Sequence, residues 1–163
     1  PKYLIGDKNF FINSLNKNGD FYINQIQTSN NKKTLIHIRR GEDYVDWGEE
    51  LPKLYFETAM NNLLNKKNIQ NYDIFTDEKK YDTSEELYRN AENIYDDTDE
   101  KPLVTLSRMI NYQNFIISNS SLSFFAAYLG ESGNSQIYYP NPWFKSINHK
   151  PYKNKNWYEV EYE

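Results

Sequence analysis

The chain has 163 residues, enough for one compact domain with a sizeable core and too few for two large ones. Its 19 basic and 23 acidic residues give a net charge of -4, which excludes a general basic surface for gripping nucleic acid or an anionic membrane. The absence of cysteine excludes a disulfide framework, thiol catalysis and thiolate metal sites.

The first half of the chain predicts a short leading segment followed by strands and helices in alternation. Residues 1–30 predict two short elements around a glycine turn, a remnant of a missing half or a linker to it. Residues 34–38 form an apolar run typical of a central parallel strand covered on both faces. The stretch GEDYVDWGEE predicts a loop, and a helix is expected over about residues 52–65, where Pro52 suits the first turn.

The second half continues the alternation. Strands are predicted in NYDIFTDE, ENIYDDTDE, NFIISNSS and SQIYYP, and helices in DTSEELYRNA, from Pro102 onward, and in SLSFFAAYLG, which Gly130 closes. An aromatic tail follows. This order predicts an α/β fold, a Rossmann-like and mostly parallel sheet with helices on both faces. Ligands of such sheets bind at the carboxyl ends of the strands.

A histidine and two arginines stand at the end of the first predicted strand. Because side chains alternate along a strand, His37 and Arg39 share one face, and Arg40 enters the following loop. An arginine side chain is a planar, permanently charged fork that matches phosphate oxygens. The alternative, which this stretch taken by itself favours, is that the arginines pair with nearby carboxylates, namely Glu42, Asp43 and Asp46.

The turn after the strand in NFIISNSS is a second candidate anion site. It contains Ser118, Asn119, Ser120 and Ser121 and precedes a predicted helix. Free backbone N–H groups at a helix start, with the helix dipole behind them, bind phosphate without a lysine. Taken by themselves, these residues are more often helix caps. Two phosphate-compatible strand ends in one sheet together favour an anion site.

Several of these stretches resemble one known family. HIRRGEDY resembles the HxRRxD motif of the α-1,2-fucosyltransferases, and LPKLYFETA is similar to the helix that follows it. IFTDE is similar to the next strand end, while FIISNSSLSFFAAYLG and PNPWF resemble the closing segments. The order and spacing agree across residues 34–144. The resemblance is to the donor-binding C-terminal half of a GT-B enzyme of glycosyltransferase family 11.

The resemblance implies that residues 31–163 form a nucleotide-sugar-binding domain. Such a domain binds GDP-fucose for an inverting transfer of fucose to a hydroxyl of a glycan acceptor, with no metal or other cofactor. Arg39 would hold the β-phosphate and Arg40 would support it, which makes both catalytic. As the fucosyl bond breaks, negative charge grows on the leaving GDP, and a fixed arginine fork stabilises that charge most in the transition state.

The remaining donor-binding residues are also carried over from the resemblance. His37 would line the nucleotide site, and Asp77 would lie near the nucleotide. The donor-binding turn would comprise Ser118, Asn119, Ser120 and Ser121, of which the last two would meet the pyrophosphate.

The sequence departs from the family pattern at two places. The motif has Asp two places after the second arginine, where this chain has Glu42 with Asp43 next, so the difference is a substitution or a one-residue insertion. The tryptophan pair of the last helix is Phe124-Phe125 here, which keeps ring bulk for a core position and loses an indole N–H. A two-domain GT-B enzyme needs roughly twice this length, and Pro1 in place of Met suggests a chain processed or cut from a longer one.

Other functions stay open at this point. One is a noncatalytic sugar-nucleotide or glycan-binding module that lacks the acceptor half, and another is an interaction domain whose arginines are salt-bridged. The DTD stretch at residues 97–99 matches a metal-binding pattern. Acidic residues just before a helix more often serve to stabilise its N-terminus, which is the favoured interpretation. A serine hydrolase is disfavoured, because GxSxG is missing and His149 lies in the tail.

The expected partners are a sugar nucleotide and a glycan acceptor, without nucleic acid. The tail aromatics could stack on such a ligand, but packing across the sheet is the favoured interpretation. No apolar run approaches the roughly 20 residues of a membrane span, and no signal-peptide pattern opens the chain. We therefore expect a soluble, cytoplasmic domain, with any membrane association arising from parts absent from this chain.

Overall fold

The computed structural model of the chain describes residue 13 and residues 33–66, 71–96, 98–146 and 154–162. In these ranges six strands form a single sheet in the order β3-β2-β1-β4-β5-β6, and all its strand pairs are parallel. The expectation of a Rossmann-like α/β fold is confirmed, and the strand order is that of the doubly wound dinucleotide-binding folds. The expected segment 1–30 lies outside the described residues, apart from residue 13.

The elements have the following bounds. The strands are β1 (Thr34–Ile38), β2 (Tyr72–Thr76), β3 (Asn93–Asp96), β4 (Asn114–Ile116), β5 (Ile137–Asn141) and β6 (Trp157–Glu161). The helices are α2 (Glu42–Trp47), α3 (Lys53–Lys66), α4 (Glu86–Arg89), α5 (Pro102–Met109) and α6 (Ser121–Gly130). Strands β1 to β5 and helices α3 to α6 lie where the sequence predicts them. No helix within the described ranges is long and apolar enough to cross a bilayer.

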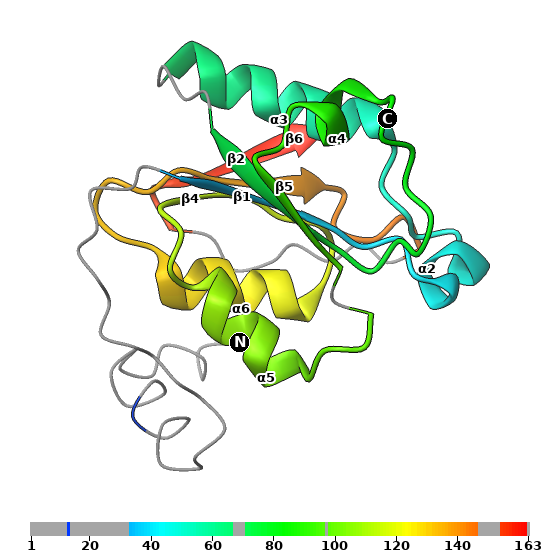
Figure 1. Cartoon of the computed structure of the whole chain (residues 1–163). Coiled ribbons are helices and arrows are strands. Elements are labelled where there is room, and N and C mark those ends of the chain that lie inside the picture. Colours follow the sequence, from blue (N-terminus) through cyan, green and yellow to red (C-terminus); the bar gives the residue numbers. More distant parts are fainter. Residues whose placement is uncertain (1–12, 14–32, 67–70, 97, 147–153, 163) are drawn as a thin grey trace.

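Helices cover both faces of the sheet, with α3 and α4 on one face and α5 and α6 on the other (Figure 1). The side chains of β1 alternate between these layers. Leu35 belongs to the core under α5 and α6, whereas Ile36 and Ile38 belong to the core under α3 and α4. All three are fully buried, and burial of each such side chain contributes about 1.5–3 kcal/mol. The strand that leads to the arginines is therefore held rigidly from both sides.

Two elements differ from the prediction. Residues 42–47 form helix α2 where a loop is predicted, and residues 157–161 form β6 where an aromatic tail is predicted. Helix α2 buries none of its residues and ends at Gly48, whose φ of 67° only glycine adopts readily. Hydrophobic periodicity cannot reveal a helix that buries nothing, because that signal comes from a buried face.

The aromatic residues near the C-terminus belong to the core. Trp143 and Trp157 are buried beside the ring of Phe124, and Trp157 begins the strand that pairs with β5. Packing across the sheet is thus the correct interpretation for these two tryptophans. Phe124 and Phe125 are partly buried against the same core. His149 lies outside the described residues.

Candidate functional site

The candidate site lies where the order of the sheet reverses. The chain builds outward from β1 through β2 to β3 and then returns to β4 on the other side of β1, so the switch point lies between β1 and β4. Ligands of doubly wound sheets bind at the carboxyl ends of the strands at this place. His37 from β1 and Ser118 from the end of β4 meet there. Ser118 Oγ is 3.0 Å from His37 Nδ1, and both residues are buried.

Arg39 follows directly after β1 and contacts two carboxylates. Its Nη1 lies 2.5 Å from Asp77 Oδ2, and its Nη2 lies 2.8 Å from Asp43 Oδ2. The meeting with Asp77 follows from the register of β1 and β2, which pairs Ile38 with Thr76 and so places the next residues of both strands side by side. Burial opposes the charged form, but these carboxylates outweigh it and raise the pKa of Arg39. Its charge is present at any working pH.

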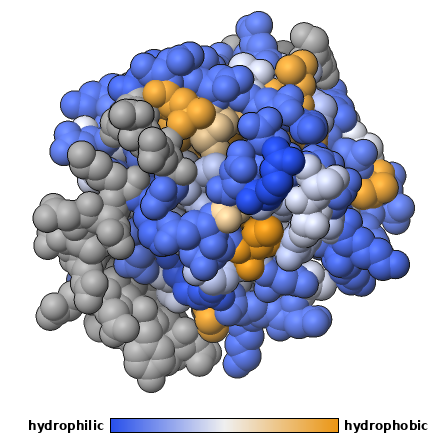
Figure 2. Space-filling model, turned by 45° about the horizontal axis from the view of Figure 1, so that its top comes forward, coloured by the Kyte–Doolittle hydropathy of each residue, from blue (hydrophilic) through white to orange (hydrophobic). Residues whose placement is uncertain are grey.

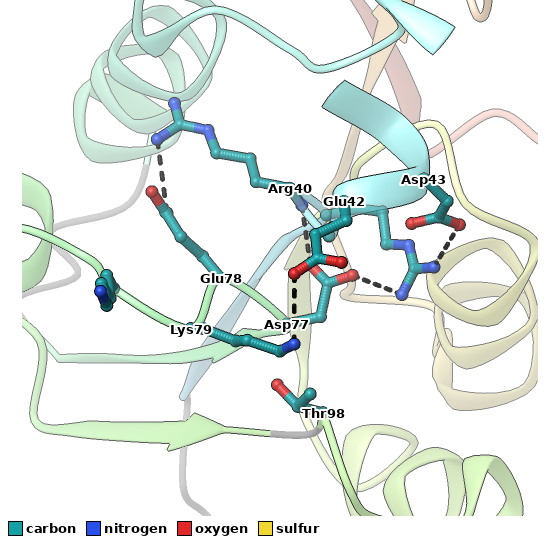
Figure 3. Close-up of a pocket in the computed structure, with 10 residues that line it drawn as sticks. Arg40, Glu42, Asp43, Asp77, Glu78, Lys79 and Thr98 are labelled. Atoms are coloured by element: carbon teal, nitrogen blue, oxygen red, sulfur yellow. Dashed lines mark hydrogen bonds and ion pairs between the residues drawn. The ribbon is translucent and has the colours of Figure 1, made fainter. Parts of the chain in front are cut away.

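Arg40 has different partners. Its backbone N–H donates to Asp77 Oδ1 at 2.7 Å, whereas its Nη1 lies 3.5 Å from Glu78 Oε2. Its guanidinium carbon lies 5.9 Å from the centre of the Phe56 ring of α3. The Arg40 guanidinium therefore lies toward Glu78 (Figure 3), whereas that of Arg39 contacts Asp77 and Asp43.

The acidic residues after the arginines have separate roles. Asp43 pairs with Arg39, whereas the largely exposed Glu42 reaches Lys79 Nζ at 3.3 Å. The sequence offers pairing of the arginines with nearby carboxylates as the alternative to phosphate binding, and the salt bridge from Arg39 to Asp43 is one such pair. Of the two acidic residues at the departure from HxRRxD, Asp43 and not Glu42 supplies a carboxylate to Arg39.

A pocket of about 600 Å³ opens beside these residues (Figure 3), within the range of small-molecule sites. Its basic lining residues are Arg39, Arg40, Lys79 and Lys80. Its acidic lining residues are Glu42, Asp43, Asp77 and Glu78. Equal numbers of the two charges leave no net positive field, so a ligand anion would compete with the two carboxylates that Arg39 contacts. Asp43 is the easier one to replace, because its side chain is 42% exposed while that of Asp77 is 7% exposed.

Gly41 allows this close packing. A Cβ atom at this position would collide with the Asp77 carboxylate and would lie 2.9 Å from Asp43 Oδ1. Nothing in the sequence singles Gly41 out, because a glycine after two arginines is an ordinary feature of a loop. Its role arises from a residue of another strand.

The turn from Ser118 to Ser121 lies beside the switch point but does not line the pocket. Ser118 and Asn119 are fully buried, Ser120 is nearly so, and Ser121 is exposed. Ser120 is the N-cap of α6, yet its side chain makes no capping hydrogen bond. Instead Ser123 Oγ, from the first turn of α6, donates to the carbonyl oxygens of Ser118 and Ser120. The structure thus brings Ser118 to His37, whereas Ser120 and Ser121 do not line the pocket that Arg39 lines.

Glu49 anchors the loop after α2. Its carboxylate accepts hydrogen bonds from the backbone N–H groups of Lys145, at 2.7 Å, and Ser146, at 3.0 Å. Its carbonyl oxygen accepts one from Asn119 Nδ2 at 2.8 Å. Burial opposes the charged carboxylate, but the hydrogen bonds from Ser146 and Lys145 outweigh it and lower the pKa of Glu49. This buried residue joins three segments, and no sequence pattern indicates it.

Substitution of Glu49 should make stability depend on pH. Folding lowers the pKa of Glu49. Its contribution to the free energy of unfolding is therefore complete above the pKa of the unfolded chain, about 4.3, and is lost as the pH falls through the pKa of the folded protein. We expect Glu49→Gln to lower the free energy of unfolding by about 2 kcal/mol at pH 7. The difference from wild type should shrink below about pH 4, as measured by urea unfolding. The exposed Glu57→Gln should change little, and a difference for Glu49→Gln that stays constant from pH 7 to pH 3 would contradict the assignment.

No metal-binding cluster of three or more histidine and carboxylate side chains occurs in the described parts of the chain. Asp97 of the DTD stretch lies outside them. The backbone N–H and the hydroxyl of Thr98 both donate to Asp96 Oδ1, at 2.9 and 2.5 Å, which forms a local turn ahead of α5.

Comparison with known proteins agrees with the sequence motifs. Residues 2–161 match the family Glycosyl transferase family 11. The chain is also similar to the O-antigen biosynthesis glycosyltransferase WbnK of Escherichia coli, with 27% identity over 153 residues. That match covers 88% of this chain and 50% of WbnK, so the chain spans about half the length of this relative. No solved structure matches. Because the family match covers nearly the whole chain, the resemblance is confirmed, and the chain belongs to glycosyl transferase family 11.

Proposed function

We propose that this chain is the donor-binding part of a glycosyltransferase that moves fucose from GDP-fucose, with inversion, to a hydroxyl of a glycan acceptor. Membership of glycosyl transferase family 11 supports glycosyl transfer. The position of Arg39 is the observation that carries the donor assignment. Its guanidinium lines a pocket of about 600 Å³ whose lining residues follow the carboxyl ends of β1, β2 and β3.

Arg39 can bind a diphosphate without losing its inner support. A guanidinium has five N–H donors in a fixed fork, so the contact with Asp77 leaves others for a ligand. The pair with Asp43 is partly exposed, and such pairs contribute only about 0–1 kcal/mol. Phosphate oxygens carrying more charge than a carboxylate can therefore take the place of Asp43.

The same contact suits the chemistry. The acceptor oxygen forms a bond to the anomeric carbon of fucose while the bond from that carbon to the β-phosphate oxygen breaks. The electron pair of the breaking bond moves onto GDP, and the hydroxyl proton passes to a base. Arg39 meets the charge that develops on the phosphate, so its contact strengthens as the bond breaks. Arg40 supports it indirectly, since its N–H donates to the same Asp77 that holds Arg39.

A second candidate is a sugar-nucleotide-binding module without transfer activity. Only half of the WbnK sequence is matched by this chain. The acceptor hydroxyl would have to be positioned by the remainder of such a protein. Donor binding and transfer are therefore separable properties of this chain.

The test is a calorimetric titration of the chain with GDP, performed once with magnesium and once with EDTA. We expect binding with a similar Kd in both, because arginine and lysine side chains line the pocket and can meet the phosphates directly. Absence of GDP binding to the folded chain, or binding that requires magnesium, would contradict the proposal. Acceptor-dependent release of GDP from GDP-fucose, assayed with a panel of disaccharides, then separates the enzyme from the noncatalytic module.

A further inference from the structure

Tyr44 of α2 stands between the two strand ends of the switch point. The guanidinium carbon of Arg39 lies 5.0 Å from the centre of the Tyr44 ring. The Tyr44 hydroxyl donates to the carbonyl oxygen of Asn119, in the turn before α6, at 3.0 Å. One side chain therefore joins the residue after β1 to the turn after β4.

We propose that Tyr44 is a positioning residue, which orients the Arg39 guanidinium for the diphosphate and ties it to the turn before α6. Arg39 has three contacts of two kinds, two ion pairs and one cation–π contact. Asp77 and Asp43 each contact one of its terminal nitrogen atoms, and the ring of Tyr44 attracts the cation at 5.0 Å. Loss of the ring would leave the guanidinium free to turn within its carboxylate contacts.

Tyr44 is also buried enough to hold helix α2 against the rest of the domain. The helix has six residues and buries none of them fully, so packing of an apolar face cannot hold it in place. Besides the ion pairs of Asp43 and Glu42, half-buried Tyr44 and the loop after the helix both make hydrogen bonds to Asn119. Burial raises the pKa of Tyr44, although the Arg39 charge opposes this, so the hydroxyl stays protonated and remains a donor near neutral pH.

The inference rests on the proposed function, because it concerns the phosphate that Arg39 holds. GDP and GMP share the base, the ribose and the α-phosphate and differ in the β-phosphate. If Tyr44 acts through Arg39, loss of the tyrosine ring must weaken the binding of GDP more than the binding of GMP. A residue that only maintains the fold would affect both nucleotides alike.

The experiment is a titration of wild type, Tyr44→Phe and Tyr44→Leu with GDP and with GMP. We expect Tyr44→Leu to raise the Kd for GDP about tenfold, in keeping with a partly desolvated cation–π contact. The Kd for GMP should change less than about twofold. Tyr44→Phe keeps the ring and should stay within about threefold of wild type for GDP. Val45→Ala, an exposed position of the same helix, is the control and should match wild type.

A second measurement reports the contact without any nucleotide. The Nε–H resonance of Arg39, assigned through Arg39→Lys, should carry a ring-current shift in wild type and in Tyr44→Phe and lose it in Tyr44→Leu. An unchanged resonance in Tyr44→Leu, or equal weakening of GDP and GMP, would overturn the role of Tyr44 even if GDP binds to wild type. Failure of the folded wild type to bind GDP at all would instead overturn the proposed function, and the role of Tyr44 with it.

Discussion

Arg39→Ala is expected to remove measurable GDP binding. The substitution deletes the guanidinium that we place on the diphosphate, and loss of one partner of a hydrogen-bonded charge pair costs about 2–5 kcal/mol, or roughly 30- to 5000-fold in affinity. It also leaves the carboxylates of Asp77 and Asp43 in the pocket without their cation, where they repel a phosphate. The measurement is a calorimetric titration with GDP.

Two further variants make this result specific. Arg39→Lys keeps a positive charge beside the buried Asp77 but loses the planar fork, so we expect folded protein with binding between those of wild type and Arg39→Ala. Arg89→Ala removes an arginine from an exposed position of α4 and should bind GDP as wild type does. Retention of wild-type affinity by Arg39→Ala would remove Arg39 from the donor site.

Asp77→Ala is expected to lower the free energy of unfolding by about 3 kcal/mol, near the lower end for breaking a buried ion pair because Arg39 is partly exposed. The carboxylate is almost fully buried and has two partners, the Arg39 guanidinium and the backbone N–H of Arg40. Removal leaves the N–H without its acceptor, which adds to the cost. Urea unfolding at pH 7 measures the change.

Matched variants separate the two interactions of Asp77. Asp77→Asn keeps an oxygen for the Arg40 N–H and loses the charge that faces Arg39, so it should cost less than Asp77→Ala. Asp46→Ala, which removes an exposed carboxylate from α2, should change the free energy by less than about 0.5 kcal/mol. If Asp77→Ala were as stable as Asp46→Ala, the ion pair would not contribute to the fold.

The parts of the fold that the sequence predicted are those with a local signal. Strand β1 is a mostly apolar run of five buried residues, and α6 ends at Gly130, where the sequence predicts its end. Helix α2 and strand β6 have no such signal. The first buries no residue, and the second has irregular burial, with Trp157 and Val160 buried on either side of a more exposed pair.

The candidate site divides in the same way. Arg39 and the turn from Ser118 to Ser121 could be found in the sequence because both follow apolar strands, where a parallel sheet presents its ligands. Tyr44 and Glu49 could not, because each side chain makes its hydrogen bonds to residues far away in the chain. Tyr44 bonds to Asn119, 75 residues on, and Glu49 to Lys145, 96 residues on.

The sequence by itself determined the fold class, the family and the placement of Arg39 at a strand end, because these depend on short runs of residues and on their order. The tertiary structure decided which carboxylate pairs with which arginine. It also decided that Gly41 must lack a side chain and that Tyr44 lies between Arg39 and the turn before α6. The physical reason is that ion pairs and close contacts depend on distance and direction in space, which the register of β1, β2 and β4 sets and no single stretch of sequence contains.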